Sequence, residues 1–368
     1  MECMLTEEQI QFAQMLERFA TQEYAEALEA RTFNRERYAR LAAMGCLSLA
    51  VPEHLGGFGG PVEVMLAMQN LAPKLPKEPI LECGVHAAAL LGATLPGAEA
   101  EAVLQTIRTG SRIVVPALWE NGIRYRTDMA STCARASADG WILSGAKHLV
   151  EFAEQADGLL VTARHAQTGE LFLFHIETST SGINLKTRAR IDSLPCADVE
   201  FTDCSVPATA LLADSGVAAM IAAAQDRAEA AQLGQMVGLM DALIRETIGY
   251  VQTRRQFGTE IGRFQALRHR IADMWIQCEE ARSLALAAAL SCDGSAEERA
   301  FTISSAKLHG SDAARLIGNE AVQMHGGIGM TDELIVSHWF KRLLALRSSL
   351  GDRRFHLSRL IDRSCAAL

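Results

Sequence analysis

The sequence lacks a hydrophobic run long enough to cross a membrane. Its longest apolar stretches lie near residues 217–224 and 284–290, and a spanning helix needs roughly 20 such residues. The first residues, MECMLTEEQIQF, carry acidic side chains where a secretory signal carries a basic segment followed by an apolar one. We therefore expect a cytoplasmic protein without a membrane segment.

Closely spaced cysteine pairs are missing too. The nine cysteines are scattered and never spaced as CxxC, so we expect reduced thiols and neither a disulfide framework nor a zinc site. The histidines show no metal-ligand spacing, and no metal is predicted. The GxSxG motif of serine hydrolases and the Walker loop are also absent from the sequence.

The chain has no excess of positive charge. It carries 35 Lys and Arg against 44 Asp and Glu, a formal net charge of −9, which argues against nucleic acid as the main partner because that binding is driven by basic residues. Its 368 residues, of which 49% are hydrophobic, can form a large core and more than one domain.

Three zones follow one another along the chain. Residues 6–109 show helical periodicity, interrupted by a glycine-rich loop at residues 50–60 that Pro61 ends. Short strand-like runs, WILSG, GLLVTAR and ELFLFHI, make up the middle zone. Asp139-Gly140 and Gln167-Thr168-Gly169 separate them and predict hairpin turns. The remainder is helical again. These patterns predict a mostly α, α+β fold with domains at 1–112, 113–214 and 215–368.

The densest basic region lies at residues 253–270. Its QFGTEIG segment predicts a turn between two helices, with Arg254 at the end of the first helix and the second beginning near Phe264. Guanidinium groups and a helix N-terminus both suit a pyrophosphate, although a solvated face or salt bridges would be the commoner explanation on an ordinary helix. The arginines of this region are Arg254, Arg255, Arg263, Arg268 and Arg270.

A glycine-rich segment, AVQMHGGIGMTDE, occupies residues 321–333. Gly326 and Gly327 end a helix and permit a close backbone approach, but a helix cap alone explains them. Because the segment follows a helix instead of a strand, it is no dinucleotide-binding fingerprint of the Rossmann type. Possible general bases cannot be ranked from the residues alone; they include Asp226, Glu229, Glu320 and Glu333.

Taken in order, several segments resemble the acyl-CoA dehydrogenase family over nearly the whole chain. The matching segments are LTEEQ, LAAMGCLSLAVPEHLGGFGG, GWILSGAKHLV with ADGLLVTAR, TRRQFGTEIGRFQALRHRIADM, and AVQMHGGIGMTDE. The resemblance implies an N-terminal helical domain, a middle β-barrel-like domain and a C-terminal four-helix bundle. It also implies FAD as cofactor, an acyl-CoA substrate, and an electron-transfer flavoprotein as the electron acceptor.

The resemblance assigns cofactor-binding roles to individual residues. Arg254 and Phe257 match the RxxFG positions that contact the FAD of a partner subunit, and Gln265 matches a glutamine of the following helix. The QxxGG stretch, which holds the ADP half of FAD in the family, corresponds to Gln323, Met324, His325, Gly326 and Gly327.

The position of the catalytic base departs from the family pattern. The family needs a carboxylate to remove the α-proton of the thioester while a hydride moves to the flavin. The usual Glu-Gly falls here on Leu350-Gly351, so the common base position holds Leu350. The family's alternative base position, on the first long helix of the C-terminal domain, corresponds to Ala228 when residues are counted back from Phe257. Glu229 is adjacent to it, but one residue turns a helix by about 100°, which predicts a surface or capping role unless the helix is shifted.

The segment expected beside the flavin ring departs as well. The family's Glu-Pro…Gly-Ser motif is missing from VPALWENGIRYRTDMAST, and Leu149 and Glu151 replace its aromatic and threonine. The C-terminal segment most resembles the small subunit of pimeloyl-CoA dehydrogenase and related paired subunits that degrade steroid side chains. In those α2β2 heterotetramers, one of two different chains supplies the base.

Three functions remain open from the sequence. The chain could be one subunit of a heteromeric acyl-CoA dehydrogenase, a non-catalytic member of the fold that serves assembly or acyl-CoA binding, or a catalytic homo-oligomer that uses Glu229.

Overall fold

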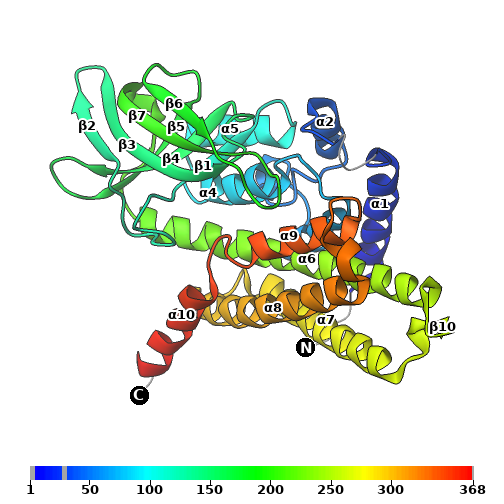
Figure 1. The fold of residues 1–368 in the computed structure, drawn as a ribbon. Helices are drawn as coiled ribbons and strands as arrows, with labels where there is room; N and C mark the ends of the chain where they lie inside the picture. Colours follow the sequence, from blue (N-terminus) through cyan, green and yellow to red (C-terminus); the bar gives the residue numbers. More distant parts are fainter. Residues whose placement is uncertain (1–4, 27–30, 367–368) are drawn as a thin grey trace. The chain divides into compact units, whose positions relative to one another are not determined.

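The structure is a computed structural model that describes residues 5–26 and 31–366, with residues 362–366 described by their backbone alone. Helices precede and follow a central sheet along the chain (Figure 1), so the predicted mostly helical α+β fold is confirmed. The chain forms two compact units. Unit 1 comprises Met1–Arg31, Pro61–Pro76 and Glu229–Leu368, and unit 2 comprises Thr32–Gly60 and Lys77–Ala228. The three-domain division stays a prediction.

Sequence signals mark the starts of the first and third helices. Thr6 and Gln9 form a reciprocal capping box at the start of the first helix, and Pro61 occupies the first position of the third helix, where a missing N–H costs nothing. The α-helices are α1 (Glu7–Glu23), α2 (Arg35–Ala43), α3 (Pro61–Leu71), α4 (Ala88–Gly92), α5 (Ala98–Arg108), α6 (Val217–Thr253), α7 (Gln265–Ser291), α8 (Ala296–His325), α9 (Ile335–Leu346) and α10 (Arg353–Ala366).

Shorter helical turns connect these helices. The 3₁₀ turns are η2 (Glu53–Leu55), η3 (Ala72–Lys74), η5 (Ala208–Ala210), η6 (Ile261–Arg263) and η7 (Gly326–Met330), and a π-helix, η4, spans Ile80–Ala87. Turn η2 lies inside the predicted loop at residues 50–60, which otherwise has no regular structure apart from turns.

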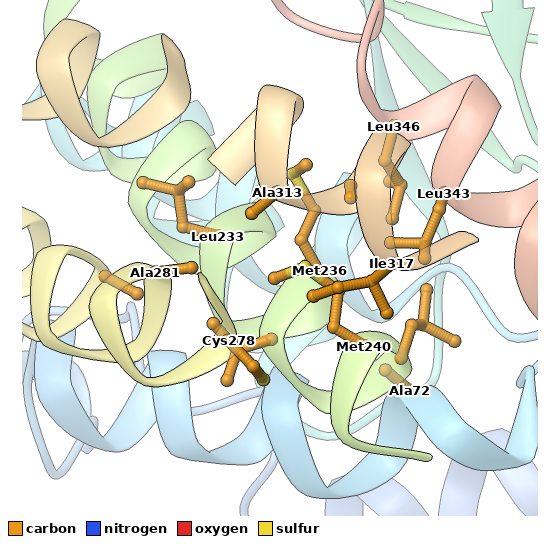
Figure 2. Packing of buried hydrophobic residues seen from close by; sticks show 14 of the residues in the cluster. Ala72, Leu233, Met236, Met240, Cys278, Ala281, Ala313, Ile317, Leu343 and Leu346 are labelled. Carbon is orange, nitrogen blue, oxygen red and sulfur yellow. The ribbon is translucent and has the colours of Figure 1, made fainter. Parts of the chain in front are cut away.

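Unit 1 is held together by an apolar core that α3, α7, α8, α9 and the later part of α6 build. Figure 2 shows this packing, in which Met236 and Met240 of α6 lie among side chains of the neighbouring helices. Leu243 and Ile244 of α6 and Met274 of α7 are all fully buried there. Helix α3, although far away in sequence, therefore shares its core with the C-terminal helices.

Unit 2 contains a sheet of eight strands among its described residues. The strands are hydrogen-bonded in the order β6-β7-β3-β2-β4-β5-β8, and β1 pairs in parallel with β4. Their bounds are β1 (Val114–Ala117), β2 (Cys133–Ser137), β3 (Gly140–Glu151), β4 (Gly158–His165), β5 (Leu171–Glu177), β6 (Ile183–Thr187), β7 (Cys196–Pro207) and β8 (Leu211–Ala213).

Both turns that the sequence predicts join antiparallel neighbours. The first lies between β2 and β3, where Ser137 pairs with Gly140, and the second lies between β4 and β5. Strand β3 also pairs with β7, and its register shifts between Lys147 and Val150. Such a bulge turns side chains away from the regular alternation of a strand, and here it places Leu149 at a φ of 53°.

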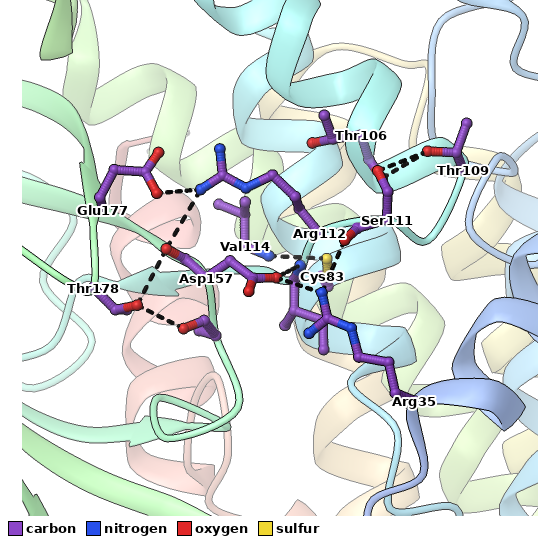
Figure 3. Close-up of polar contacts among 12 residues, drawn as sticks. Arg35, Cys83, Thr106, Thr109, Ser111, Arg112, Val114, Asp157, Glu177 and Thr178 are labelled. Atoms are coloured by element: carbon purple, nitrogen blue, oxygen red, sulfur yellow. Dashed lines mark hydrogen bonds and ion pairs between the residues drawn. The ribbon is translucent and has the colours of Figure 1, made fainter.

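Asp157 joins separate segments within unit 2, as Figure 3 shows. Its Oδ2 accepts hydrogen bonds from the Arg35 guanidinium at 2.9 Å and from the Ile113 amide at 2.8 Å. The nearby Cys83 sulfur accepts a bond from the Val114 amide at 3.3 Å. Helix α2, π-helix η4 and strand β1 are thereby tied to the start of β4.

Most of the cysteine side chains lie among the described residues. The seven cysteines whose side chains are described form no disulfide, whereas Cys3 and the Cys365 side chain lie outside the described residues. Burial raises the pKa of Cys46 and Cys278 to about 12, so these thiols stay protonated and unreactive. Among the described residues, no helix combines the length and apolar character that a membrane span needs, and no three potential ligands gather around a metal site.

Acid is expected to destabilise the fold through His86 of the π-helix. Burial lowers the pKa of this side chain from 6.5 to about 4, so the unfolded chain binds a proton before the folded chain does. Between these two values, the free energy of unfolding should fall by about 1.4 kcal/mol for each unit of pH lost. Denaturant titrations of His86→Gln should show a shallower pH dependence. The exposed His54 provides the control: His54→Gln should keep the wild-type slope, and equal slopes in all three proteins would contradict the expectation.

Candidate functional site

The connection between α6 and α7 presents Arg254 and Phe257 to the surface of unit 1. Strands β9 (Arg255–Gln256) and β10 (Thr259–Glu260) form a small hairpin. Its two central residues, Phe257 and Gly258, have φ values of 54° and 79°, the combination of a tight type I′ turn. Phenylalanine rarely adopts a positive φ. The Phe257 side chain is also 91% exposed. The hairpin thus holds an apolar ring out in solvent.

Four of the five arginines predicted to form an anion site already have partners in the structure. Arg263 contacts the Glu260 carboxylate at 2.9 Å and Arg255 contacts it at 3.4 Å. The side chains of Arg268 and Arg270 bind the Gly262 carbonyl and the Glu320 carboxylate. These contacts agree with the salt-bridge alternative for Arg255, Arg263 and Arg270, and the anion site stays a prediction. Among the described residues, Arg254 makes no side-chain hydrogen bond or ion pair, and it remains available to an anion.

Gln265 is the first residue of α7 and is exposed, with Phe264 as the N-cap. The predicted helix start near Phe264 is therefore confirmed. The residue lies one turn or less from free backbone N–H groups, which favour a negatively charged ligand.

The end of α8 divides the predicted QxxGG stretch into an exposed and a buried half. Gln323, Gly326 and Gly327 are exposed, whereas Met324 and His325 are buried. Gly326 has φ 68° and ψ −147°, a conformation that requires glycine. A Cβ at Gly326 or Gly327 would meet no atom within 4 Å. The exposed half can therefore contact a ligand, while the buried half supports it.

Tyr250 brings the two predicted cofactor segments together. Its ring stacks on the His325 imidazole with centroids 4.4 Å apart, and its hydroxyl donates to the His325 carbonyl at 3.4 Å. The Tyr250 carbonyl accepts from the Arg254 amide one helical turn later, at 2.9 Å. Arg254 and the Gln323–Gly327 stretch consequently belong to the same end of unit 1.

The bulged end of β3 carries Leu149 and Glu151, the two residues predicted to replace the family's flavin-flanking pair. Leu149 is 38% exposed, and its amide donates to Asp198 at 3.1 Å. Glu151 forms an ion pair with Arg190, which also binds Asp192 through two hydrogen bonds of 2.9 Å. The Glu151 carboxylate is therefore already engaged by a partner.

Glu229 lies in a buried polar cluster of unit 1, so the predicted surface or capping role is wrong. Its side chain is fully buried in the middle of α6. The Oε2 atom lies 3.6 Å from His356 Nε2 and 4.0 Å from the Arg359 guanidinium, both on α10. Burial together with the positive charges of Lys307 and Arg359 lowers the pKa of His356 to about 2, so this imidazole is neutral. We call Glu229, Gln232, Lys307 and His356 the buried cluster.

Leu350 occupies a tight turn between α9 and α10. Its φ is 60°, and the following Gly351 fits closely against His356, whose Nε2 would lie 2.4 Å from an added Cβ. Asp352 accepts a hydrogen bond from the Phe355 amide at 2.9 Å and starts α10. The remaining carboxylate candidates are no better placed as bases. Glu320 is paired with Arg270, Glu333 is exposed, and Asp226 is buried in unit 2.

Comparison with known proteins decides the family. The family described as "Acyl-CoA dehydrogenase, N-terminal domain" matches residues 6–92, and "Acyl-CoA dehydrogenase, C-terminal domain" matches residues 214–364. Together these matches cover more than half of the sequence. The chain belongs to the acyl-CoA dehydrogenase family. The family predicted from the sequence segments, with its flavoprotein oxidoreductases of acyl-CoA metabolism, is thereby confirmed.

Individual acyl-CoA dehydrogenases and their structural relatives are similar over most of the chain. The human mitochondrial short-chain specific acyl-CoA dehydrogenase is 28% identical over 316 residues, covering 82% of this chain and 76% of the relative. The ChsE4-ChsE5 complex from Mycobacterium tuberculosis contains a chain with a TM-score of 0.84, 23% identity and full coverage of both chains. The FAD complex of PigA has a TM-score of 0.87, 22% identity and 99% coverage of both chains.

The sequence interpretation missed Lys307 and His356 of the buried cluster. Lys307 lies among buried residues of α8, such as Ile303, Ala306 and Gly310, at helical spacing. A charged residue on such a stripe is a signal of a buried polar contact. The signal was therefore present, but the sequence does not reveal which groups on other helices the lysine meets.

Proposed function

We propose that this chain is one subunit of a heteromeric, FAD-dependent acyl-CoA dehydrogenase that introduces an α,β double bond into an acyl-CoA thioester. A second, different chain of the same family supplies the catalytic base. The proposal rests on the residues found at the two positions where a catalytic base is expected. One holds Leu350, and the carboxylate next to the other, Glu229, is fully buried among Lys307, Arg359 and His356.

The residues at the end of unit 1 fit a flavin nucleotide. Arg254 offers an unengaged guanidinium for a pyrophosphate, and Gln323, Gly326 and Gly327 offer exposed polar and backbone groups. Phe257, almost fully exposed, would be covered by the bound group or by the partner. FAD, when bound, accepts a hydride from the β-carbon of the thioester. The FAD complex of PigA and the paired ChsE4-ChsE5 chains support the cofactor and the pairing.

The removal of the α-proton is assigned to the partner. This chain would hold the nucleotide, while a carboxylate of the second chain takes the proton. The steroid-side-chain and pimeloyl-CoA types of paired dehydrogenase remain the proposed subtypes, with a cytoplasmic location and an electron-transfer flavoprotein as acceptor. A panel of straight-chain, dicarboxylic and sterol side-chain thioesters would identify the substrate.

Co-expression tests the proposal. The chain should be purified alone and together with a longer acyl-CoA dehydrogenase chain encoded beside its gene, and both should be assayed for bound flavin and for flavin reduction by the thioester panel. We expect no reduction with the isolated chain and rapid reduction with the complex. Full flavin content and turnover in the isolated chain would overturn the pairing and favour the Glu229 homo-oligomer.

A matched pair of arginine variants extends the same experiment. Arg254→Ala in the complex should weaken FAD binding by about 10- to 100-fold, because a charge-assisted hydrogen bond contributes roughly 1.5–3 kcal/mol. Arg263→Ala, from the same connection but paired with Glu260, should keep its flavin. Unchanged flavin content and turnover in both variants would instead favour a non-catalytic role in assembly.

A further inference from the structure

We propose that Lys307 is a positioning residue that holds the turn of residues 347–351 and thereby fixes the backbone of residue 350, the family's base position. The inference deepens the proposed function and rests on it for the meaning of that position. According to this proposal, the chain retains the contacts that would hold a catalytic carboxylate at position 350, although the residue there is leucine.

The hydrogen bonds of Lys307 carry the first step. The ammonium group is buried and donates to the Leu346 carbonyl at 2.9 Å and to the Ser349 carbonyl at 3.0 Å. Its third proton is donated to the Gln232 side chain. All three donors of the lysine are thus used. One binds the carbonyl of Leu346, the last residue of α9, which has no partner inside the helix, and another binds the Ser349 carbonyl in the turn that follows.

The backbone of residue 350 carries the second step. Leucine at a φ of 60° is strained, and such a conformation persists only where the surroundings impose it. Lys307 fixes the turn on one side, and Asp352 caps α10 on the other. Between them, Gly351 leaves room for the His356 ring. The turn is therefore held from several elements at once.

The electrostatics of the cluster point the same way. Burial and the nearby Arg342 lower the pKa of Lys307 to about 8, although the Glu229 charge opposes this shift. A buried cation seldom stabilises a fold more than apolar residues of similar volume would. Lys307 donates all three of its protons to Gln232 of α6 and to the backbone of residues 346 and 349. We therefore explain its presence by its effect on the conformation of the turn at residues 347–351.

The chemistry at position 350 gives a direct test. In Leu350→Glu, the new carboxylate would take the α-proton of the thioester while the β-hydride reduces the oxidised FAD, so that both hydrogens and both electrons are accounted for. We expect this variant, prepared with the partner's own base replaced by glutamine, to regain single-turnover flavin reduction that Leu350→Gln lacks. Adding Lys307→Met should slow that reduction at least tenfold at equal flavin content. Equal rates with and without Lys307 would overturn the proposal.

Hydrogen exchange provides a readout that needs no flavin. Lys307→Met in the full chain should speed amide exchange in residues 347–351 at least tenfold, relative to the rest of unit 1. Lys147→Met, which removes another fully buried lysine from unit 2, should leave this segment protected. If Lys307→Met does not fold, Lys307→Arg serves instead, because it keeps the charge but changes the donor geometry. Unchanged protection of the turn in the folded variant would overturn the positioning role, whereas a missing flavin with a loosened turn would contradict only the proposed function.

Discussion

Gly238→Ala is expected to lower the free energy of unfolding by about 3 kcal/mol or more. A Cβ at this position of α6 would lie 2.0 Å from the Gln69 carbonyl oxygen of α3, and at Gly234 it would lie 2.3 Å from the Met65 oxygen. Backbone atoms of a packed helix cannot move aside as a flexible side chain can. Overpacking of this kind usually costs about 1–3 kcal/mol and sometimes more.

The same helix contains the control for this prediction. Gly249 also lies in α6, but an added Cβ there would meet no atom within 4 Å. Gly249→Ala should therefore raise the free energy of unfolding by up to about 1 kcal/mol, the difference in helix propensity between glycine and alanine. Urea titrations followed by circular dichroism would measure both variants. A Gly238→Ala midpoint equal to that of the wild type would show that α3 and α6 can move apart without cost.

These glycines show what local sequence patterns could and could not predict about the fold. Periodicity gives the order of helices and strands, because apolar spacing reflects which face of each element is buried. The turns at Asp139-Gly140 and Gln167–Gly169 were predictable for the same local reason. The pairing of α3 with α6 was not, since it joins segments far apart in the sequence. It also depends on the close approach of α3 to Gly234 and Gly238, which no local pattern indicates.

The residues of the candidate site also differ in whether the sequence could predict them. Arg254, Phe257 and the Gln323–Gly327 stretch were predictable because they lie in short contiguous motifs. The engagement of the other arginines was not, because Glu260 and Glu320 become their partners only when the chain folds. The buried cluster could not be predicted from the sequence for the same reason. Glu229 and His356 are separated by more than one hundred residues and meet through the packing of α6 and α10.

Lys147→Met is expected to destabilise unit 2 by about 3–5 kcal/mol, the usual result of removing one partner from a buried ion pair. The Lys147 ammonium is fully buried and lies 2.6 Å from Glu120 Oε1, with Thr162 as a second acceptor at 2.9 Å. Burial lowers the pKa of Lys147 to about 8 although Glu120 opposes the shift, and the contact with the lysine helps to lower the pKa of Glu120. Each group therefore depends on the other for its charge.

Glu120→Leu should be more damaging than Lys147→Met, because the two partners differ in what else they hold. Glu120 also accepts hydrogen bonds from the amides of Ser131 and Thr132, at 2.6 and 3.1 Å, and from the Thr132 hydroxyl at 2.7 Å. Removing it leaves these donors without that acceptor and leaves the lysine without its counterion, whereas Lys147→Met leaves all three of these bonds in place.

The double variant separates the ion pair from these additional bonds. Lys147→Met/Glu120→Leu should unfold at a higher denaturant concentration than Glu120→Leu alone, because no buried charge remains without a counterion. The coupling free energy between the two sites, measured from the four unfolding midpoints, should be about 1–3 kcal/mol. Strictly additive effects would show that Glu120 stabilises the sheet through the amides of residues 131–132 and not through its charge.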